Sequence, residues 1–365
     1  MNRENIGIIT MSYGTNYGNK LQNYAMQKIY QSLGFNVETI KLKPKNIKYA
    51  RKKNSIHYYC MRLLYKFKCK LYKKNIIERI KKFDDFNKNM LNWSEEIYTE
   101  YTYKTIDSNK YSFISAGSDQ IWNTYFDDFY EVFLLDFAKQ DEKKIAYAPS
   151  FGVDTISKKY FEIFKENLNH FKAISIREES GKKLLKEKFN IDAPVVLDPT
   201  LLLEEKEWEK LIEKIDKRKH KSYVLTYYLG NVSTLQKKAI RKFAIKSKYE
   251  IIKLNDICNN YYSIDPIQFV YYIKNAKMVF TDSFHACCFS GIFEIPFWVV
   301  NRNSVKKDMN ARIDTFLELG GLENRKWNKD SKLAEEINFS TLKYNVRKQR
   351  MSSLGYLKSA LDIEE

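Results

Sequence analysis

Buried strands and amphipathic helices alternate from the start of the chain. The apolar run 5–12 predicts a strand, and the segment 20–33, which repeats apolar residues at helical spacing before Gly34, predicts a helix. A second apolar run, 36–42, predicts the next strand. This strand–loop–helix–strand opening, with a first loop rich in Gly and Asn, is typical of a doubly wound α/β sheet.

The alternation resumes near residue 93 and continues to the end of the chain. Further strands are predicted at 111–115, 144–148, 171–176, 193–197, 222–228, 249–254, 277–280 and 297–301, and further helices from Lys182 and at 204–218, 232–246, 265–275, 285–295, 309–320 and 340–361. Polar, turn-forming residues follow the strands, and loops at the carboxyl ends of parallel strands usually build active sites. We therefore expect the functional residues in these loops.

The pattern divides the chain into two domains. A chain of 365 residues is too long for one ordinary core. The predicted class is α/β, with two Rossmann-like domains, 1–203 and 204–335, facing a cleft. A C-terminal helix within 336–365 is expected to pack back on the N-terminal domain, and a basic helical insertion at about 44–93 interrupts that domain.

Positive charge is concentrated in one segment. The net charge is +18, but the window Lys41–Lys82 has sixteen Lys and Arg residues against one acid, Glu78. The rest of the chain is close to neutral and no recognition module accompanies the charge, so we expect no nucleic-acid partner. Aromatic and apolar residues recur in the window at helical spacing. It therefore suits either the surface of an anionic membrane or a helical insertion with a solvated lysine face.

Composition indicates the compartment. No apolar run approaches the roughly 20 residues of a membrane span, and the first apolar stretch is too short for a signal peptide. The five cysteines show no metal-ligand spacing. We expect a cytoplasmic protein, peripheral at the inner face of the membrane if the basic segment binds lipid, and no metal site.

The stretch Lys277–Gly291 combines a strand, a polar turn and a helix start. A helix N-terminus beyond a parallel strand offers unpaired N–H groups and a positive dipole end to an anion. His285 would lie at that position and can exchange a proton near neutral pH. The alternative is that Ser283 or Asp282 caps the helix and His285 is a half-buried neutral side chain.

Seven short motifs along the chain resemble, in sequence and in order, those of the polysaccharide pyruvyl transferases. The resemblance covers roughly residues 5–325 and leaves out the basic insertion and the C-terminal helix. The matching motifs are Asn16-Tyr17-Gly18-Asn19 with Leu21-Gln22, 115–123, 146–152, 175–180, 195–200, 281–285 and 311–313.

The resemblance implies a fold similar to the GT-B glycosyltransferases and a ketal-forming transferase. Pyruvate would move from phosphoenolpyruvate, as co-substrate and without a cofactor, onto two hydroxyls of a sugar, releasing phosphate. The acceptor would be a surface polysaccharide or its precursor on a lipid diphosphate. This chemistry needs an acid for the enol methylene, cations for the donor and a base for the hydroxyl.

The resemblance also implies roles for individual residues. His285 would be the acid and Asp119 the base. The candidate donor-binding residues are Arg177, Ser283, His285 and Arg312, and the candidate acceptor-binding residues are Asn19, Gln22, Asp119 and Gln120.

Several of these residues have structural alternatives. Asp119 and Asn19 could cap the helices that follow them, because both residue types favour that position. Arg312 could be a solvated helix residue, and Arg177 could pair at the surface with Glu178 or Glu179.

Position 283 departs from the family. Many members carry an arginine two residues before the histidine, which helps to bind phosphoenolpyruvate, whereas this chain has Ser283. Ser283 and the helix N-terminus would then bind the donor together with Arg177 and Arg312, or the donor would differ. The alternatives are a nucleotide-sugar-dependent glycosyltransferase of the same architecture and a non-catalytic, membrane-associated binding protein.

Overall fold

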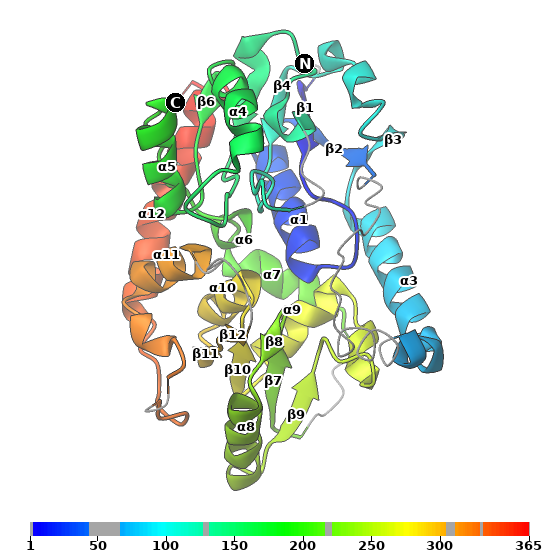
Figure 1. Cartoon of the computed structure of the whole chain (residues 1–365), viewed down its shortest axis with the longest axis vertical. Helices are drawn as coiled ribbons and strands as arrows, with labels where there is room; N and C mark the ends of the chain where they lie inside the picture. The colour runs from blue at the N-terminus through cyan, green and yellow to red at the C-terminus, as the bar shows by residue number, and fades with distance from the viewer. Residues whose placement is uncertain are drawn as a thin grey trace.

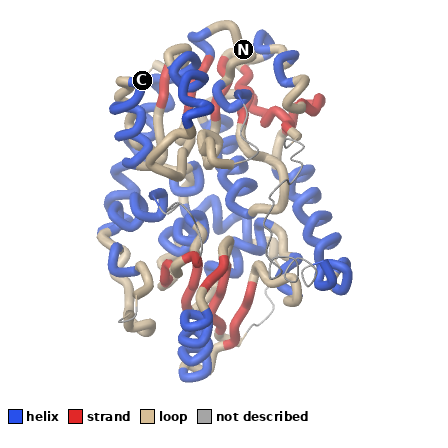
Figure 2. Tube along the Cα trace, in the orientation of Figure 1, coloured by secondary structure: helices blue, strands red, loops and turns tan. Residues whose placement is uncertain are grey.

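The computed structural model describes residues 3–43, 66–126, 131–215, 221–303, 311–328 and 331–364. Two groups of strands lie toward opposite ends of the molecule, with helices and loops between them (Figure 1, Figure 2). Each group forms a separate parallel sheet.

The N-terminal half contains a six-stranded parallel sheet. Its strand order, β3-β2-β1-β4-β5-β6, is that of a Rossmann sheet. The order reverses between β1 and β4, and ligands usually bind where parallel sheets reverse in this way. The strands are β1 Asn5–Ile9, β2 Asn36–Leu42, β3 Trp93–Tyr98, β4 Phe113–Ala116, β5 Lys144–Ala146 and β6 Ala173–Ile174.

Helices cover both faces of this sheet. One face packs with α1 and α12 through side chains such as Met26 and Leu357, and the other carries a core that includes Trp122 and Phe164. The helices described before residue 204 are α1 Tyr17–Ser32, α3 Lys73–Met90, α4 Phe161–Leu168, α5 Glu179–Phe189 and α6 Pro199–Leu202.

The C-terminal half contains a four-stranded parallel sheet in the order β11-β10-β7-β9, which reverses between β7 and β10. A short antiparallel pair, β8 and β12, lies apart from it. The strands are β7 Tyr223–Tyr227, β8 Asn231–Val232, β9 Glu250–Lys253, β10 Met278–Thr281, β11 Phe297–Val299 and β12 Arg302–Asn303. The helices are α7 Glu205–Ile212, α8 Thr234–Lys246, α9 Pro266–Lys274, α10 Phe284–Ile292 and α11 Ala311–Gly320.

The two halves share one hydrophobic core. Tyr17 of α1 stacks on Phe269 of α9 with ring centroids 4.5 Å apart, and Tyr24 packs near Trp208 of α7 at 5.8 Å. Aromatic pairs of this kind add to the free energy of burial. The junction is therefore apolar along α1.

Helix α3 braces this junction through Arg79. The Arg79 side chain is buried and donates from Nη1 to the Tyr17 hydroxyl (2.5 Å) and to the Tyr262 carbonyl (2.6 Å), and from Nη2 to the Thr15 carbonyl (2.8 Å). Its guanidinium also lies over the Tyr17 ring at 4.5 Å. One side chain thus joins α3 to both halves of the chain.

The final helix, α12 Ser340–Ala360, also contacts both halves. Leu342 packs in the shared core, whereas Leu357 packs under the first sheet. The Ser353 hydroxyl accepts a hydrogen bond from the Leu197 amide at 3.0 Å. The chain therefore returns to its N-terminal half at its end (Figure 1).

The architecture confirms the predicted α/β class with two Rossmann-like halves in a GT-B-like arrangement. The predicted strand at 193–197 is wrong, because only an isolated bridge between Val195 and Ile176 forms there. Strand β3 was not predicted. Of the expected basic insertion, residues 44–65 lie outside the described residues, while α3 packs on the protein through Arg79, Phe83 and Phe86.

Candidate active site

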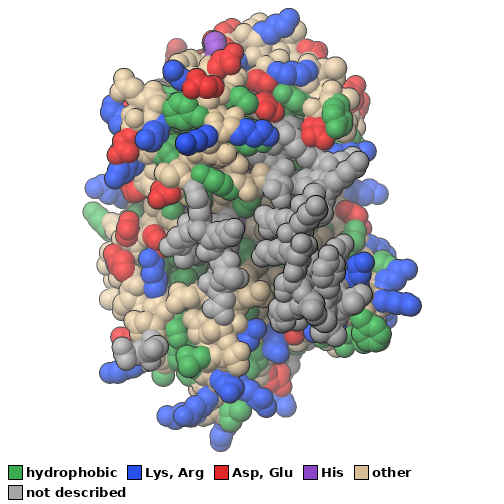
Figure 3. Space-filling model, in the orientation of Figure 1, with side chains coloured by type: hydrophobic (Ala, Val, Ile, Leu, Met, Phe, Trp, Pro, Cys, Tyr) green, Lys and Arg blue, Asp and Glu red, His purple; other side chains and the backbone are tan. Residues whose placement is uncertain are grey.

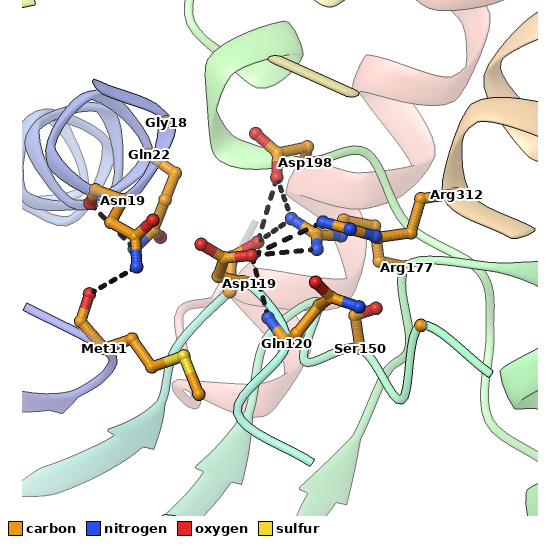
Figure 4. Close-up of polar contacts among 12 residues, drawn as sticks. Met11, Gly18, Asn19, Gln22, Asp119, Gln120, Ser150, Arg177, Asp198 and Arg312 are labelled. Carbon is orange, nitrogen blue, oxygen red and sulfur yellow. Dashed lines mark hydrogen bonds and ion pairs between the residues drawn. The ribbon is translucent and has the colours of Figure 1, made fainter. Parts of the chain in front are cut away.

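The carboxyl ends of both sheets meet at one buried cluster of charged side chains (Figure 4). Asp119 follows β4, Arg177 follows β6 and Asp198 caps α6 in the N-terminal half. His285 and Arg312 come from α10 and α11 of the C-terminal half. All five side chains are buried, so water screens their charges poorly.

Arg177 and Asp198 form the central ion pair. Arg177 Nη1 lies 2.6 Å from Asp198 Oδ2, and the two side chains are 1% and 0% exposed. The Ser118 hydroxyl donates to the same Asp198 oxygen at 3.0 Å. Burial raises the pKa of Asp198, but His285 and Arg177 outweigh burial and hold that pKa far below its usual range. These charges therefore favour the ionised form of the Asp198 carboxyl.

The surface ion pair suggested for Arg177 is wrong. Its guanidinium points inward to Asp198 and Asp119, whereas Glu178 Oε1 accepts hydrogen bonds from the Phe151 and Gly152 amides at 2.9 and 3.0 Å. Arg177 Nε is buried and has no hydrogen-bond partner among the described residues. That N–H can serve a ligand.

Asp119 links the two arginines. Its Oδ1 lies 3.4 Å from Arg177 Nη2 and 3.5 Å from Arg312 Nη1, and it accepts a hydrogen bond from the Gln120 amide at 2.8 Å. Burial raises the pKa of Asp119, but the charges of Arg177, His285 and Arg312 outweigh burial and lower it.

The Asp119 backbone is unusual. Its φ is +80°, which few residues other than glycine adopt and which concentrates at functional sites. A turn rather than a helix follows it, so the expected helix-capping alternative is wrong.

His285 lies in the first turn of α10, against the backbone of α1. A Cβ atom placed on Gly18 would lie 2.0 Å from His285 Nδ1, so only glycine leaves room for the ring. His285 Nε2 lies 3.7 Å from Asp198 Oδ2, within ion-pair distance. The ring is 5% exposed, and Nε2 has no hydrogen-bond partner among the residues that the structure describes.

Phe284 places the two guanidiniums beside the start of α10. Arg177 Cζ lies 4.9 Å and Arg312 Cζ 5.7 Å from the centre of its ring. A cation over an aromatic face is stabilised by the ring quadrupole. Arg312 is 8% exposed, so its interpretation as a solvated helix residue is wrong.

Ser283 occupies the N-cap position of α10 but makes no side-chain capping bond. The preceding residue, Asp282, accepts hydrogen bonds from the Leu229 and Gly230 amides at 2.7 and 2.8 Å. Asp282 therefore ties the loop after β10 to the loop after β7, rather than capping the helix. The capping alternative is wrong for both side chains.

The first turn of α1 faces the loop after β4. Asn16 caps α1, so the expected cap at Asn19 is wrong. Asn19 lies within the helix and donates from Nδ2 to the Met11 carbonyl at 3.2 Å. Gln22 donates to the Thr10 hydroxyl at 3.1 Å, and Thr10 donates to the Ser118 carbonyl beside Asp119 at 2.8 Å.

Gln120 packs on the backbone of a neighbouring loop. A Cβ atom on Gly152 would lie 1.7 Å from Gln120 Nε2, and Gly152 has a φ of +65°. Gln120 Nε2 is buried and has no hydrogen-bond partner within the described ranges. The predicted acceptor-binding residues thus lie on α1 and the loop after β4 (Figure 4).

Sequence reasoning missed Asp198, Ser118, Phe284 and Gly18 as site residues, although each lies within a motif quoted above. Asp198 follows an apolar run and precedes Pro199, which is a signal for a helix cap. In the structure Asp198 has this capping role, since it accepts a hydrogen bond from the Thr200 amide at 2.9 Å. The same signal hid its second contact with Arg177.

The cluster can bind an anion and exchange a proton beside it. Two guanidiniums and an imidazole lie beside two carboxylates, and the Nε–H of Arg177 has no hydrogen-bond acceptor among the described residues. Among the described residues, no group of His, Cys, Asp and Glu has the geometry of a metal site. Within the same residues, no helix is long and apolar enough to cross a bilayer.

A family model described as polysaccharide pyruvyl transferase matches residues 16–304. The match covers most of the chain and includes the loop after β4, Arg177, Asp198 and the start of α10. No curated protein matches the chain.

Solved structures with related backbones have low sequence identity to this chain. A candidate UDP-N-acetylglucosamine 2-epimerase from Listeria monocytogenes is 11% identical with a TM-score of 0.49, covering 100% of this chain and 91% of its own. The E. coli ADP-heptose LPS heptosyltransferase II is 10% identical with a TM-score of 0.38, covering 98% of each chain. The glycotransferase of kitacinnamycin is 9% identical with a TM-score of 0.37, and the alignment covers 99% of this chain and 95% of that one. At these values, none of the three informs the reaction of this chain.

Proposed function

The chain belongs to the polysaccharide pyruvyl transferase family, and we propose that it moves pyruvate from phosphoenolpyruvate onto two hydroxyls of a sugar. The observation that carries the proposal is the buried cluster in which Arg177, Arg312 and His285 converge from both halves. Phosphoenolpyruvate is a small polyanion, and preorganised guanidiniums bind its carboxylate and phosphate in paired hydrogen bonds.

The donor lies against Arg177, Arg312 and the start of α10. Both guanidiniums contact Phe284, the neighbour of Ser283, and so supply positive charge where other members have an arginine. Ser283 and the unpaired N–H groups of the helix add uncharged donors. The ion pairs of Asp119 with these arginines keep the cluster near neutral until the anion arrives.

His285 acts as the general acid. It gives its proton to the methylene carbon of phosphoenolpyruvate while a sugar hydroxyl attacks the neighbouring carbon, forming a C–H and a C–O bond. The bond from that carbon to the phosphate oxygen then breaks and phosphate leaves with the electron pair. The second hydroxyl attacks the same carbon and its proton passes to phosphate, which closes the cyclic ketal. Asp198 holds the imidazolium by charge (Nε2 to Oδ2, 3.7 Å).

Asp119 directs the attacking hydroxyl. A carboxylate with a lowered pKa is a weak base, so Asp119 accepts a hydrogen bond first and takes the proton only as the new C–O bond makes the hydroxyl acidic. The amides of Asn19, Gln22 and Gln120 hold the remaining sugar hydroxyls. The reaction as written needs no metal and no further cofactor.

The acceptor in this proposal is a sugar of a surface polysaccharide or capsule, or of its lipid-diphosphate-linked precursor, and the enzyme works in the cytoplasm. The family match supports the acceptor class. The proposed donor, phosphoenolpyruvate, is a cytoplasmic metabolite and supports the compartment.

Calorimetric titration of phosphoenolpyruvate tests the donor. We expect micromolar binding by the wild type, and binding weakened at least tenfold in Arg312→Ala and His285→Ala. Arg312→Lys, which keeps the charge, is the matched control and should retain part of the affinity. Binding of a uridine or guanosine diphosphate sugar in place of phosphoenolpyruvate would instead identify a glycosyltransferase.

A further inference from the structure

The outward face of residues 66–81 is strongly basic. Six exposed lysines, which we call the basic face, lie on it: Lys66, Lys68, Lys70, Lys73, Lys74 and Lys81. The single acid in this stretch, Glu78, lies 3.4 Å from Lys82, which is outside the basic face. The basic face thus has six lysines against this one acid within residues 66–81, while Asp84 and Asp85 follow farther along α3.

Large apolar side chains are exposed among these lysines. Phe67, Leu71, Ile77 and Ile80 are 66%, 65%, 54% and 47% exposed. Single exposed apolar residues are common, but four within residues 67–80, two just before α3 and two on it, form a patch that is unfavourable in water. Green and blue side chains appear together over α3 at the lower right of Figure 3.

The opposite side of α3 fixes the orientation of the basic face. Phe83 and Phe86 are buried in the shared core, and Arg79 is bonded to the two halves as described. Asn75 adds a hydrogen bond from Nδ2 to the Ile257 carbonyl at 3.0 Å. These contacts hold α3 against both halves, with the side chains of Lys73, Lys74, Ile77, Ile80 and Lys81 on its exposed side.

We propose that the basic face is a docking surface for an anionic lipid bilayer. Lysines attract the headgroups while Phe67, Leu71, Ile77 and Ile80 insert beside them, as in helices that lie in the membrane interface. Charge complementarity selects an anionic surface. The apolar side chains favour a bilayer over nucleic acid, whose phosphate backbone offers them no partner. The surface goes beyond the transferase reaction and does not depend on it.

Vesicle co-sedimentation tests the surface without any substrate. The full chain is expected to bind vesicles of phosphatidylcholine with about one third phosphatidylglycerol, and not vesicles of phosphatidylcholine alone. The triple variant Lys70→Glu, Lys74→Glu, Lys81→Glu should bind more than tenfold more weakly, because each lysine near an anionic surface is worth about fivefold in partitioning. Ile77→Ser with Ile80→Ser should weaken binding severalfold at unchanged charge.

A matched variant on α8 controls for net charge. Lys237→Glu, Lys238→Glu and Lys242→Glu change exposed lysines on a different helix by the same amount. If both triple variants lose vesicle binding to the same extent, the proposal is overturned, because the loss then reflects net charge and not the basic face. Absence of binding to the anionic vesicles, or binding of a DNA duplex that the triple variant at Lys70, Lys74 and Lys81 abolishes, would overturn it as well.

Discussion

The imidazole of His285 lies against the main chain of α1, so residue 18 controls where the ring can sit. Gly18→Ala would place a Cβ atom 2.0 Å from Nδ1 and force the ring or the helix to move. A misplacement of about 1 Å in a reacting group costs on the order of 100-fold in rate. We expect kcat, measured as phosphate release, to fall by about this factor.

Gly355→Ala is the matched control for that substitution. It adds the same methyl group within a helix, but nothing lies within 4 Å of the new atom. Its kcat should equal that of the wild type. Full activity in Gly18→Ala would mean that the position of His285 does not matter to the reaction.

The Asp198 carboxylate compensates the buried charge of Arg177. Its pKa is lowered in the folded protein, so its contribution to stability is present above the unfolded pKa of about 3.9 and is lost as the pH falls below it. Asp198→Asn leaves Arg177 buried with less compensation, which typically costs about 3–5 kcal/mol. Urea unfolding should show this loss near neutral pH and a smaller difference from the wild type below about pH 4.

Asp362→Asn provides the comparison for Asp198. Asp362 pairs with Lys172, but its side chain is 69% exposed, and exposed pairs contribute about 0–1 kcal/mol. A comparable loss in both variants would argue that burial of the pair is irrelevant to its strength.

Lys20 titrates near physiological pH because it is buried. Burial lowers its pKa to about 8, and its ammonium donates to the Ser12 carbonyl in the loop after β1. Since the unfolded chain binds this proton up to a pH of about 10.4, the folded state gains stability as the pH rises from about 8 to about 10.

Lys20→Met removes this gain. The stability of the wild type relative to the variant should rise by about 2 kcal/mol over that pH range, measured by urea unfolding. Lys28→Met, on the exposed side of the same helix, controls for the loss of a lysine from α1. If the difference in unfolding free energy between the wild type and Lys20→Met does not grow with pH, burial does not lower the pKa of Lys20.

At the scale of elements, the hydrophobic pattern predicted most of the strands and helices. The strand 36–42 and the helix 340–361 agree with the structure within one residue. The prediction failed at 193–197, because an apolar run can be buried without a full strand partner. It also missed β3, whose outward charged residues Glu95 and Glu96 break the apolar run.

The loop positions of the site could be predicted, but its contacts could not. Polar residues follow β4, β6 and β10 in the sequence, which predicts that the site lies at the carboxyl ends of the strands. Which carboxylate meets which guanidinium depends on how two sheets far apart in sequence approach each other. For that reason the local alternatives for Arg177 and Asp119 were wrong, and the contact of Gly18 with His285 left no signal beyond the presence of a glycine.

Helix α3 acts as a brace through one side chain. Arg79→Ala removes three hydrogen bonds that join α3 to the Tyr17 hydroxyl and to two carbonyls. Leaving such groups buried without partners costs about 1–3 kcal/mol each. We expect a loss of several kcal/mol in urea unfolding and faster amide exchange in 260–263, which α3 contacts.

Lys81→Ala on the exposed side of α3 serves as the control. It should leave both measurements within about 0.5 kcal/mol of the wild type. Unchanged exchange in Arg79→Ala would show that the two halves hold together without the brace.

At the scale of the whole molecule, two ion pairs of the cluster join the N-terminal half to the C-terminal half. Asp119 meets Arg312, and Asp198 meets His285, across the junction. In the reaction proposed above, His285 and Arg312 come from one half and Asp119 and Arg177 from the other, so the reaction needs both halves. Apolar contacts such as that of Tyr17 with Phe269 join the halves away from these charges, so we expect packing at the junction to influence the geometry of the cluster.

The path of α12 has a consequence for how the protein is made. A ribosome releases the N-terminal half first, yet the core under its sheet is completed by Leu357, Ala360 and Leu361, which are synthesised only after the C-terminal half. Domains usually fold in the order of their synthesis. Here one apolar face of the first sheet stays uncovered until α12 has been synthesised, by which time the second half has already emerged. We therefore expect the newly made chain to need chaperones most in the interval before α12 leaves the ribosome.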